Sequence, residues 1–334
     1  MGSWVSLAAV SIALTALLGA ALRLVLAGSV PPFGDFGFLR HAHTHLGYYG
    51  GLFPLMWLAW AGRGGPQFGP RWRWLYGVSV VVSVIGFVRA GYGPIAIAGS
   101  TAVLVGWLWS AAALFRRRDR GWLGAAAWGV LLGSAMIPWV AASVSTGRSG
   151  FVARSFLGLL LLGALTPSAM ARIDAKPWPR WLWVLSTTVG ALALGAVEGP
   201  HLAALALVGL LLGRSVLSAE LPHPLRFAWL VTAAGLTLMG LHLLELSHSA
   251  AVAGVHFVVL GPLLMTFWPR RIGEGWSWGY LALVGTMSGA ILSQQWGLLA
   301  QGPKIAAWSG VAIAMALVFE ATTALIQRKA GAAE

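Results

Sequence analysis

Apolar residues fill the chain in long runs, and short groups of Gly, Pro or charged residues separate one run from the next. A run of about 20 apolar residues is what an α-helix needs to cross the hydrocarbon core of a bilayer. Twelve runs are predicted as spanning helices, at 4–27, 39–62, 74–91, 94–115, 121–145, 151–171, 180–197, 200–217, 224–245, 247–268, 277–296 and 305–327. We therefore expect an all-α, polytopic membrane protein with about 12 transmembrane helices.

The composition fits this expectation and narrows the chemistry. The 334 residues are 58% hydrophobic and 9% charged, with a mean hydropathy of +0.79. No long polar linker separates folding units, so we predict a single transmembrane domain over residues 1–334. The absence of cysteine excludes thiolate-ligated clusters, cysteine-attached haem and disulfides. Any metal must therefore be held by His, Met or carboxylate.

The charge distribution predicts an orientation. The chain carries 22 Lys and Arg against nine Asp and Glu, for a net charge of +13. These charges lie in short connections between apolar runs, which is typical of a topology signal, so we expect no nucleic-acid partner. The twelve-helix scheme leaves only six on one side: Arg23, Arg40, Arg89, Arg148, Arg154 and Lys304. The rich side, with both termini, is predicted to be the cytoplasmic side of a bacterial-type inner membrane.

Histidines gather toward the opposite, outer side. The run His41-Ala42-His43-Thr44-His45 opens the second predicted helix. On the same scheme, four further histidines lie at the outer side: His201, His242, His248 and His256. Ionisable residues inside a membrane are costly and usually mark a functional site. For His201 and His242, however, hydrogen-bonded packing is the commoner role.

Helical geometry divides the first three histidines between two faces. At about 100° per residue, His41 and His45 share one face while His43 points almost opposite. The His43 face continues through Gly47, Gly50 and Pro54, which are small or flat residues. Such positions either let another helix approach closely or leave room for a planar ligand. On the tenth predicted helix, His248 and His256 are separated by about 12 Å of rise and could line one cavity at two depths.

Neutral imidazole is a ligand for haem iron, copper and zinc alike. Two imidazoles on different apolar helices suit one b-type haem, with copper as the alternative metal. The preferred axial pair is His43 and His256, and the second choice is His41 and His248. His45 is a further axial candidate, and His242 and His201 are the weakest metal candidates.

The residues from His41 to Phe53 resemble the second-helix motif of the haem-copper oxidase subunit I superfamily, including its NnrS-type and short oxidase-I-like members. In that motif a His-x-His pair is followed by Leu and Gly within an aromatic run. The segment 248–257, followed by Gly261 and Met265, is similar in kind to the tenth helix. The resemblance implies a pseudo-threefold bundle of twelve helices, in which helices two and ten hold a haem near the outer face. It also implies Lys304, helped by Arg40, as partners of the haem propionates.

The chain also departs from that family. The predicted helices 151–171 and 180–197 contain no histidine for the active-site copper, so the chain is not a complete terminal oxidase. The expected role is electron transfer or handling of a diatomic gas, NO or O2. Other respiratory-type subunits or a redox partner would act at the outer face, with membrane lipids around the bundle.

Other interpretations of the sequence remain open. A copper- or metal-handling transporter could receive its ion at residues 41–45 and His248, although the scattered methionines form no Met-x-x-Met cluster. A non-catalytic structural or assembly subunit would keep the fold without a cofactor. The repeat is equally open, because twelve helices divide into three groups of four or two groups of six. A hydrolase is disfavoured, since no paired carboxylates or Ser/His/Asp set lie at one depth.

Overall fold

The computed structural model describes residues 2–117, 121–145, 149–196, 202–245, 247–268, 274–294 and 297–330. Within these residues 85% are helical and none forms a strand, which confirms the all-α prediction. Among the described residues, seven helices are long and apolar enough to cross a membrane, so the chain is a multi-pass membrane protein. These helices are Trp4–Leu26, Pro70–Ala90, Pro94–Arg116, Trp122–Val140, Gly150–Arg172, His248–Phe267 and Gly302–Ile326.

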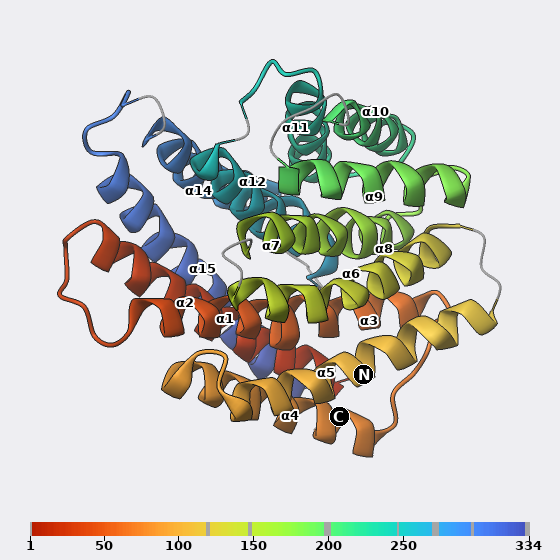
Figure 1. Cartoon of the computed structure of the whole chain (residues 1–334), viewed down its shortest axis with the longest axis horizontal. Coiled ribbons are helices and arrows are strands. Elements are labelled where there is room, and N and C mark those ends of the chain that lie inside the picture. Colours follow the sequence, from red (N-terminus) through yellow and green to blue (C-terminus); the bar gives the residue numbers. More distant parts are fainter. Residues whose placement is uncertain are drawn as a thin grey trace. The chain divides into compact units, whose positions relative to one another are not determined.

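Contacts between Cα atoms divide the chain into two compact units. Unit 1 comprises Met1–Leu58, Gln67–Gly106 and Trp278–Glu334. Its helices are α1 (Gly2–Leu26), α2 (Phe36–His45), η1 (Leu46–Leu52), the start of α3 (Phe53–Gly62), α4 (Pro70–Ala90), most of α5 (Pro94–Arg116), most of α14 (Glu274–Ser293) and α15 (Gly302–Ala330). The first and last helices, α1 and α15, pack side by side (Figure 1).

Unit 2 comprises Ala59–Pro66 and Trp107–Ser277. Its helices are α6 (Trp122–Ser145), α7 (Ser149–Gly158), η2 (Leu159–Leu165), α8 (Thr166–Arg172), α9 (Arg180–Ala196), α10 (Ala203–Leu217), α11 (His223–Gly240), α12 (His248–Val258), η4 (Val259–Leu263) and α13 (Leu264–Phe267). Helix α9 packs against both α7 and α10, and α10 packs against α11 (Figure 1).

The two helices that carry the candidate ligands, α2 and α12, each begin at a side-chain cap. The Asp35 carboxylate accepts a hydrogen bond from the Phe38 amide at 2.9 Å and starts α2. The Ser247 hydroxyl accepts one from the Ala250 amide at 3.1 Å and starts α12. Asp and Ser are preferred at this position because they satisfy amides that have no partner within the helix. The caps therefore fix the positions of the histidines that follow.

Three segments, η1, η2 and η4, interrupt the regular α-helix within the described residues: η1 and η2 are π-helical, and η4 contains a kink at Gly261, whose ψ of −105° is not helical. They interrupt the second, sixth and tenth predicted runs, which are four runs apart. Each segment ends on Gly-x-Leu: Gly50-Gly51-Leu52, Gly163-Ala164-Leu165 and Gly261-Pro262-Leu263. In this register His45 and His256 each precede the glycine of their own segment by five residues. Single turns of π-helix inside α-helices occur often at functional sites.

Proline explains why the turns widen at η1 and η2. Pro54 lies four residues after Gly50, and Pro167 lies four residues after Gly163. Because proline has no amide hydrogen, the carbonyl four residues before it loses its helical hydrogen bond. The backbone near each glycine is then free to take a wider turn.

Glycines also bring helices of one unit into close contact. A Cβ atom on Gly129 of α6 would overlap the backbone of Gly163 in η2. In unit 1, a Cβ atom on Gly86 of α4 would overlap the backbone of Ala96 in α5. Small residues at such crossings allow the backbones to touch, which is how membrane helices gain packing energy without a hydrophobic drive.

Candidate functional site

The three histidines of α2 lie on two different faces of the helix. The rings of His41 and His45 are neighbours, with centroids 6.4 Å apart, and both lie near Phe87 of α4. His43 faces α1 instead, where its Nδ1 atom lies 2.9 Å from the carbonyl oxygen of Thr15. One short helix thus presents imidazoles to two separate surroundings within unit 1.

Helix α1 packs tightly along the His43 face. A Cβ atom on Gly19 would lie 2.6 Å from Cε1 of His43, and one on Gly47 would lie 3.0 Å from the Thr15 side chain. A Cβ atom on Gly51 would lie 2.8 Å from Cγ1 of Ile12, and one on Gly50 would overlap the Ser11 side chain. The glycines that follow His43 therefore let α1 approach α2 closely.

His45 lies within an aromatic cluster. Its ring is stacked on Phe87, with centroids 4.0 Å apart and an interplanar angle of 25°, and it meets Tyr49 edge-on at 5.0 Å. His41 meets Tyr92 edge-on at 4.7 Å. The Nδ1 atom of His45 lies 2.8 Å from the His41 carbonyl oxygen, one turn earlier in the same helix. These contacts hold the His45 ring in one orientation.

His256 of α12 has the same local arrangement, with Nδ1 2.8 Å from the carbonyl oxygen of Val252. A carbonyl oxygen only accepts hydrogen bonds, so Nδ1 carries the hydrogen in the neutral rings of His43, His45 and His256. The lone pair then lies on Nε2. Metal-ligating histidines are commonly oriented in this way, by a backbone carbonyl at the other ring nitrogen.

The remaining candidate histidines are in different surroundings. His248 is the exposed first residue of α12, and His242 is exposed in the turn after α11, with a φ of 58°. His201 lies outside the described residues. His43 belongs to unit 1 and His256 to unit 2, so each is described within its own unit.

Cationic residues were expected near the haem edge. Arg40 and Lys304, the two residues predicted for the propionates, are both exposed. Sequence inspection missed Arg23, which is half-buried on α1 and close enough to His43 to act electrostatically on its ring. Thr15, Gly19 and Arg23 are spaced four residues apart, so they form one stripe of α1. The spacing predicts that these residues share one face of α1, but it does not predict that this face contacts α2.

The described residues contain no group of three or more His, Asp or Glu arranged to hold a bare metal ion. A structural zinc site takes four protein ligands, and a catalytic one takes three. A haem iron receives four nitrogens from its porphyrin and needs only one or two from the protein.

Outside the histidine region, buried tryptophans tie helices of unit 2 together through their indole nitrogens. Trp60 donates to the Ser168 hydroxyl at 2.9 Å, and Trp229 donates to the Thr266 hydroxyl at 3.1 Å. These bonds satisfy polar atoms that would be costly to leave unpaired in an apolar interior. They hold the helices in place and carry no reactive group.

No protein-family model matches the chain, and a comparison with curated proteins finds no significant match.

Proposed function

We propose that this protein binds one b-type haem within the membrane and uses it for electron transfer or for handling a diatomic gas such as NO or O2. The observation that carries the proposal is the burial and the Nδ1 contact that His43, His45 and His256 have in common. Each is half-buried, and each has its Nδ1 atom held by a backbone carbonyl, which puts the lone pair of the neutral ring on Nε2, the atom that would bind iron. A backbone carbonyl at Nδ1 is the way in which metal-ligating histidines are commonly oriented.

His43 and His256 are the preferred axial pair. His45 is engaged on one ring face by Phe87 and at its edge by Tyr49, which suits a packing role. The exposed position of His248 makes it a weaker choice than His256. His41 remains the alternative on α2.

The proposed arrangement is an oxidase-like, pseudo-threefold bundle of twelve helices with both termini in the cytoplasm. Two features support it. Helices of the structure overlap every one of the twelve predicted runs. An interruption of the regular α-helix recurs in the second, sixth and tenth runs, each time together with a closing Gly-x-Leu. A threefold repeat of four helices accounts for that recurrence, whereas two groups of six do not.

When bound, the haem would supply a one-electron redox couple, and a vacant axial position would let it bind a gas. The chain's own part is to orient imidazole through Thr15 and Val252 and to keep water from the apolar surroundings. Arg23 offers positive charge beside His43, where a propionate would be stabilised, and Arg40 and Lys304 offer exposed cations. A redox partner or further respiratory-type subunits would exchange electrons at the outer face.

The decisive experiment is visible spectroscopy of detergent-purified protein from cells with ample haem, oxidised and dithionite-reduced, with and without carbon monoxide. We expect a Soret band and reduced α and β bands. Bands unmoved by carbon monoxide indicate two axial histidines and an electron carrier, whereas a shift indicates an open position for gas.

The double variant His43→Ala/His256→Ala should lose these bands, while His223→Ala, at an exposed position, should keep them. A featureless spectrum of the wild-type protein would overturn the proposal. Elemental analysis of the same sample would then separate a copper-handling protein from a structural or assembly subunit.

A further inference from the structure

Three arginines from separate parts of unit 2 converge on one turn. Arg63 belongs to the turn after α3, Arg117 follows the last residue of α5, and Arg172 ends α8. A Cβ atom on Gly64 would lie 3.2 Å from Nη1 of Arg117, and one on Gly62 would lie 3.9 Å from Nη1 of Arg172. Three guanidinium groups therefore surround residues 62–64.

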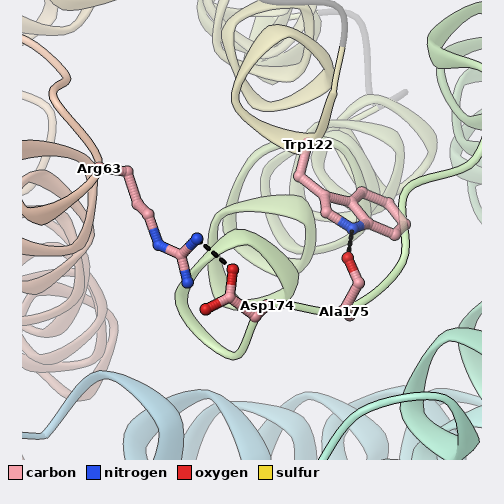
Figure 2. Close-up of polar contacts among 4 residues, drawn as sticks. All are labelled: Arg63, Trp122, Asp174 and Ala175. Carbon is pink, nitrogen blue, oxygen red and sulfur yellow. Dashed lines mark hydrogen bonds and ion pairs between the residues drawn. The ribbon is translucent and has the colours of Figure 1, made fainter.

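The turn and the facing loop are held in place. The Gly64 and Gly65 amides donate to the carbonyls of Ala61 and Trp60 at 3.1 and 2.6 Å, and Gly64 has a φ of 73°, which favours glycine. On the facing side, the indole nitrogen of Trp122 donates to the Ala175 carbonyl at 2.8 Å (Figure 2). The arginines thus project from a fixed backbone.

Within the part of the chain that the structure describes, one carboxylate pairs with the cluster. Arg63 pairs with the Asp174 carboxylate, as Figure 2 shows. Among the described residues, neither Arg117 nor Arg172 has a hydrogen-bond or ion-pair partner. Both side chains are exposed, so a ligand can reach them. Three guanidinium groups around one carboxylate leave two positive charges for an anion.

We propose that Arg63, Arg117 and Arg172 form a binding site for the phosphate of an anionic phospholipid headgroup. Guanidinium groups match phosphate oxygens in geometry and charge. Arg117 and Arg172 lie at the ends of the membrane-length helices Pro94–Arg116 and Gly150–Arg172, where lipid phosphates are found. A topology signal alone requires arginines on one side of the membrane, but it does not require three of them to meet. The site is independent of haem binding.

The test measures lipid binding by native mass spectrometry of the full-length protein in detergent, titrated with phosphatidylglycerol or phosphatidylcholine. We expect wild-type protein to retain phosphatidylglycerol preferentially. The variant Arg117→Gln/Arg172→Gln should bind it about thirtyfold more weakly, since each of the two arginines near a headgroup contributes about 1 kcal/mol. Arg71→Gln removes one exposed charge at the start of α4 and serves as the control that should bind as wild type does.

A second variant changes the charge in the opposite direction. Asp174→Asn removes the one paired carboxylate and should tighten phosphatidylglycerol binding, and Asn tolerates the left-handed backbone at this position, where φ is 55°. This variant still tests the lipid site if the arginine variant fails to fold. Unchanged binding in Asp174→Asn, or an equal loss in Arg71→Gln, would overturn the proposal. So would displacement of the lipid by an equal concentration of inorganic phosphate, which would identify a soluble phosphate ligand instead.

Discussion

The Nδ1 atom of His43 lies 2.9 Å from the carbonyl oxygen of Thr15, so a residue of α1 orients a histidine of α2. His45 and His256 differ in this respect, because each is held by the carbonyl of its own helix one turn earlier. The orientation of His43 therefore depends on how two helices pack, whereas that of the other two depends on local helix geometry. A change in α1 should alter His43 without touching α2.

Gly19→Ala makes such a change. Its Cβ atom would lie 2.6 Å from Cε1 of His43, closer than side-chain atoms normally approach, so the ring must move away from Thr15. We expect less haem per protein in the spectrum and a loss of stability of about 1–3 kcal/mol.

Gly77→Ala is the matched control, because a Cβ atom at this helical position meets nothing within 4 Å. This substitution should leave the spectrum unchanged and raise stability by up to about 1 kcal/mol. Identical behaviour of the two variants in thermal unfolding and in the Soret band would contradict the role given to α1.

Replacing the proposed axial ligand by a residue without a side chain separates ligation from folding. We expect His256→Gly to lose the haem bands and to regain them when imidazole is supplied with haem, because the added imidazole can occupy the space left by the ring. The same substitution at the exposed His248 should leave the bands intact. The opposite result, with His248 essential and His256 dispensable, would reassign the ligand on α12.

Much of the fold could be predicted because it depends on local pattern. Apolar runs located the helices, and a rotation of 100° per residue separated His43 from His41 and His45. The run 39–62, however, contains α2, η1 and α3, and apolar residues do not reveal where an α-helix widens into a π-helix. Pro54 was the local signal for that widening.

The missing parts of the site depend on contacts between distant segments. The stripe of α1 that includes Gly19 and Arg23 faces His43 only because α1 packs on α2. Arg117 and Arg172 both lie near the turn at Arg63, although 55 residues of sequence separate them from one another. The periodicity of residues within one helix does not predict such contacts between distant segments.

The glycine contact between α6 and η2 should be essential for unit 2. Gly129→Ala would place a methyl group against the backbone of Gly163, which cannot rotate aside as a side chain could. We expect a loss of about 3 kcal/mol or more, or failure to fold. Gly133→Ala, one turn later in the same helix and also buried, should be tolerated, because its nearest neighbour is 4.0 Å away. Equal thermal midpoints for the two variants would show that α6 and η2 do not touch there.

The ion pair between Arg63 and Asp174 should give stability a defined pH dependence. The hydrogen bond and charge of Arg63 hold the pKa of the Asp174 carboxyl below its usual value. The stabilisation is therefore complete above the unfolded-state pKa of about 4 and is lost as the pH falls through the lower folded-state value. We expect wild type to unfold at a slightly higher temperature than Asp174→Asn when both are measured in neutral lipid at a pH between about 5 and 8.

That difference should shrink below about pH 4 as the carboxyl is protonated. It should be small throughout, because Asp174 is exposed, and it should shrink further in high salt. Both tests use the same pair of proteins and scanning calorimetry. A difference that persists in acid and in high salt would mean that Asp174 stabilises the loop through its backbone conformation rather than through its charge, and Arg63 would then be as available to an anion as Arg117 and Arg172 are.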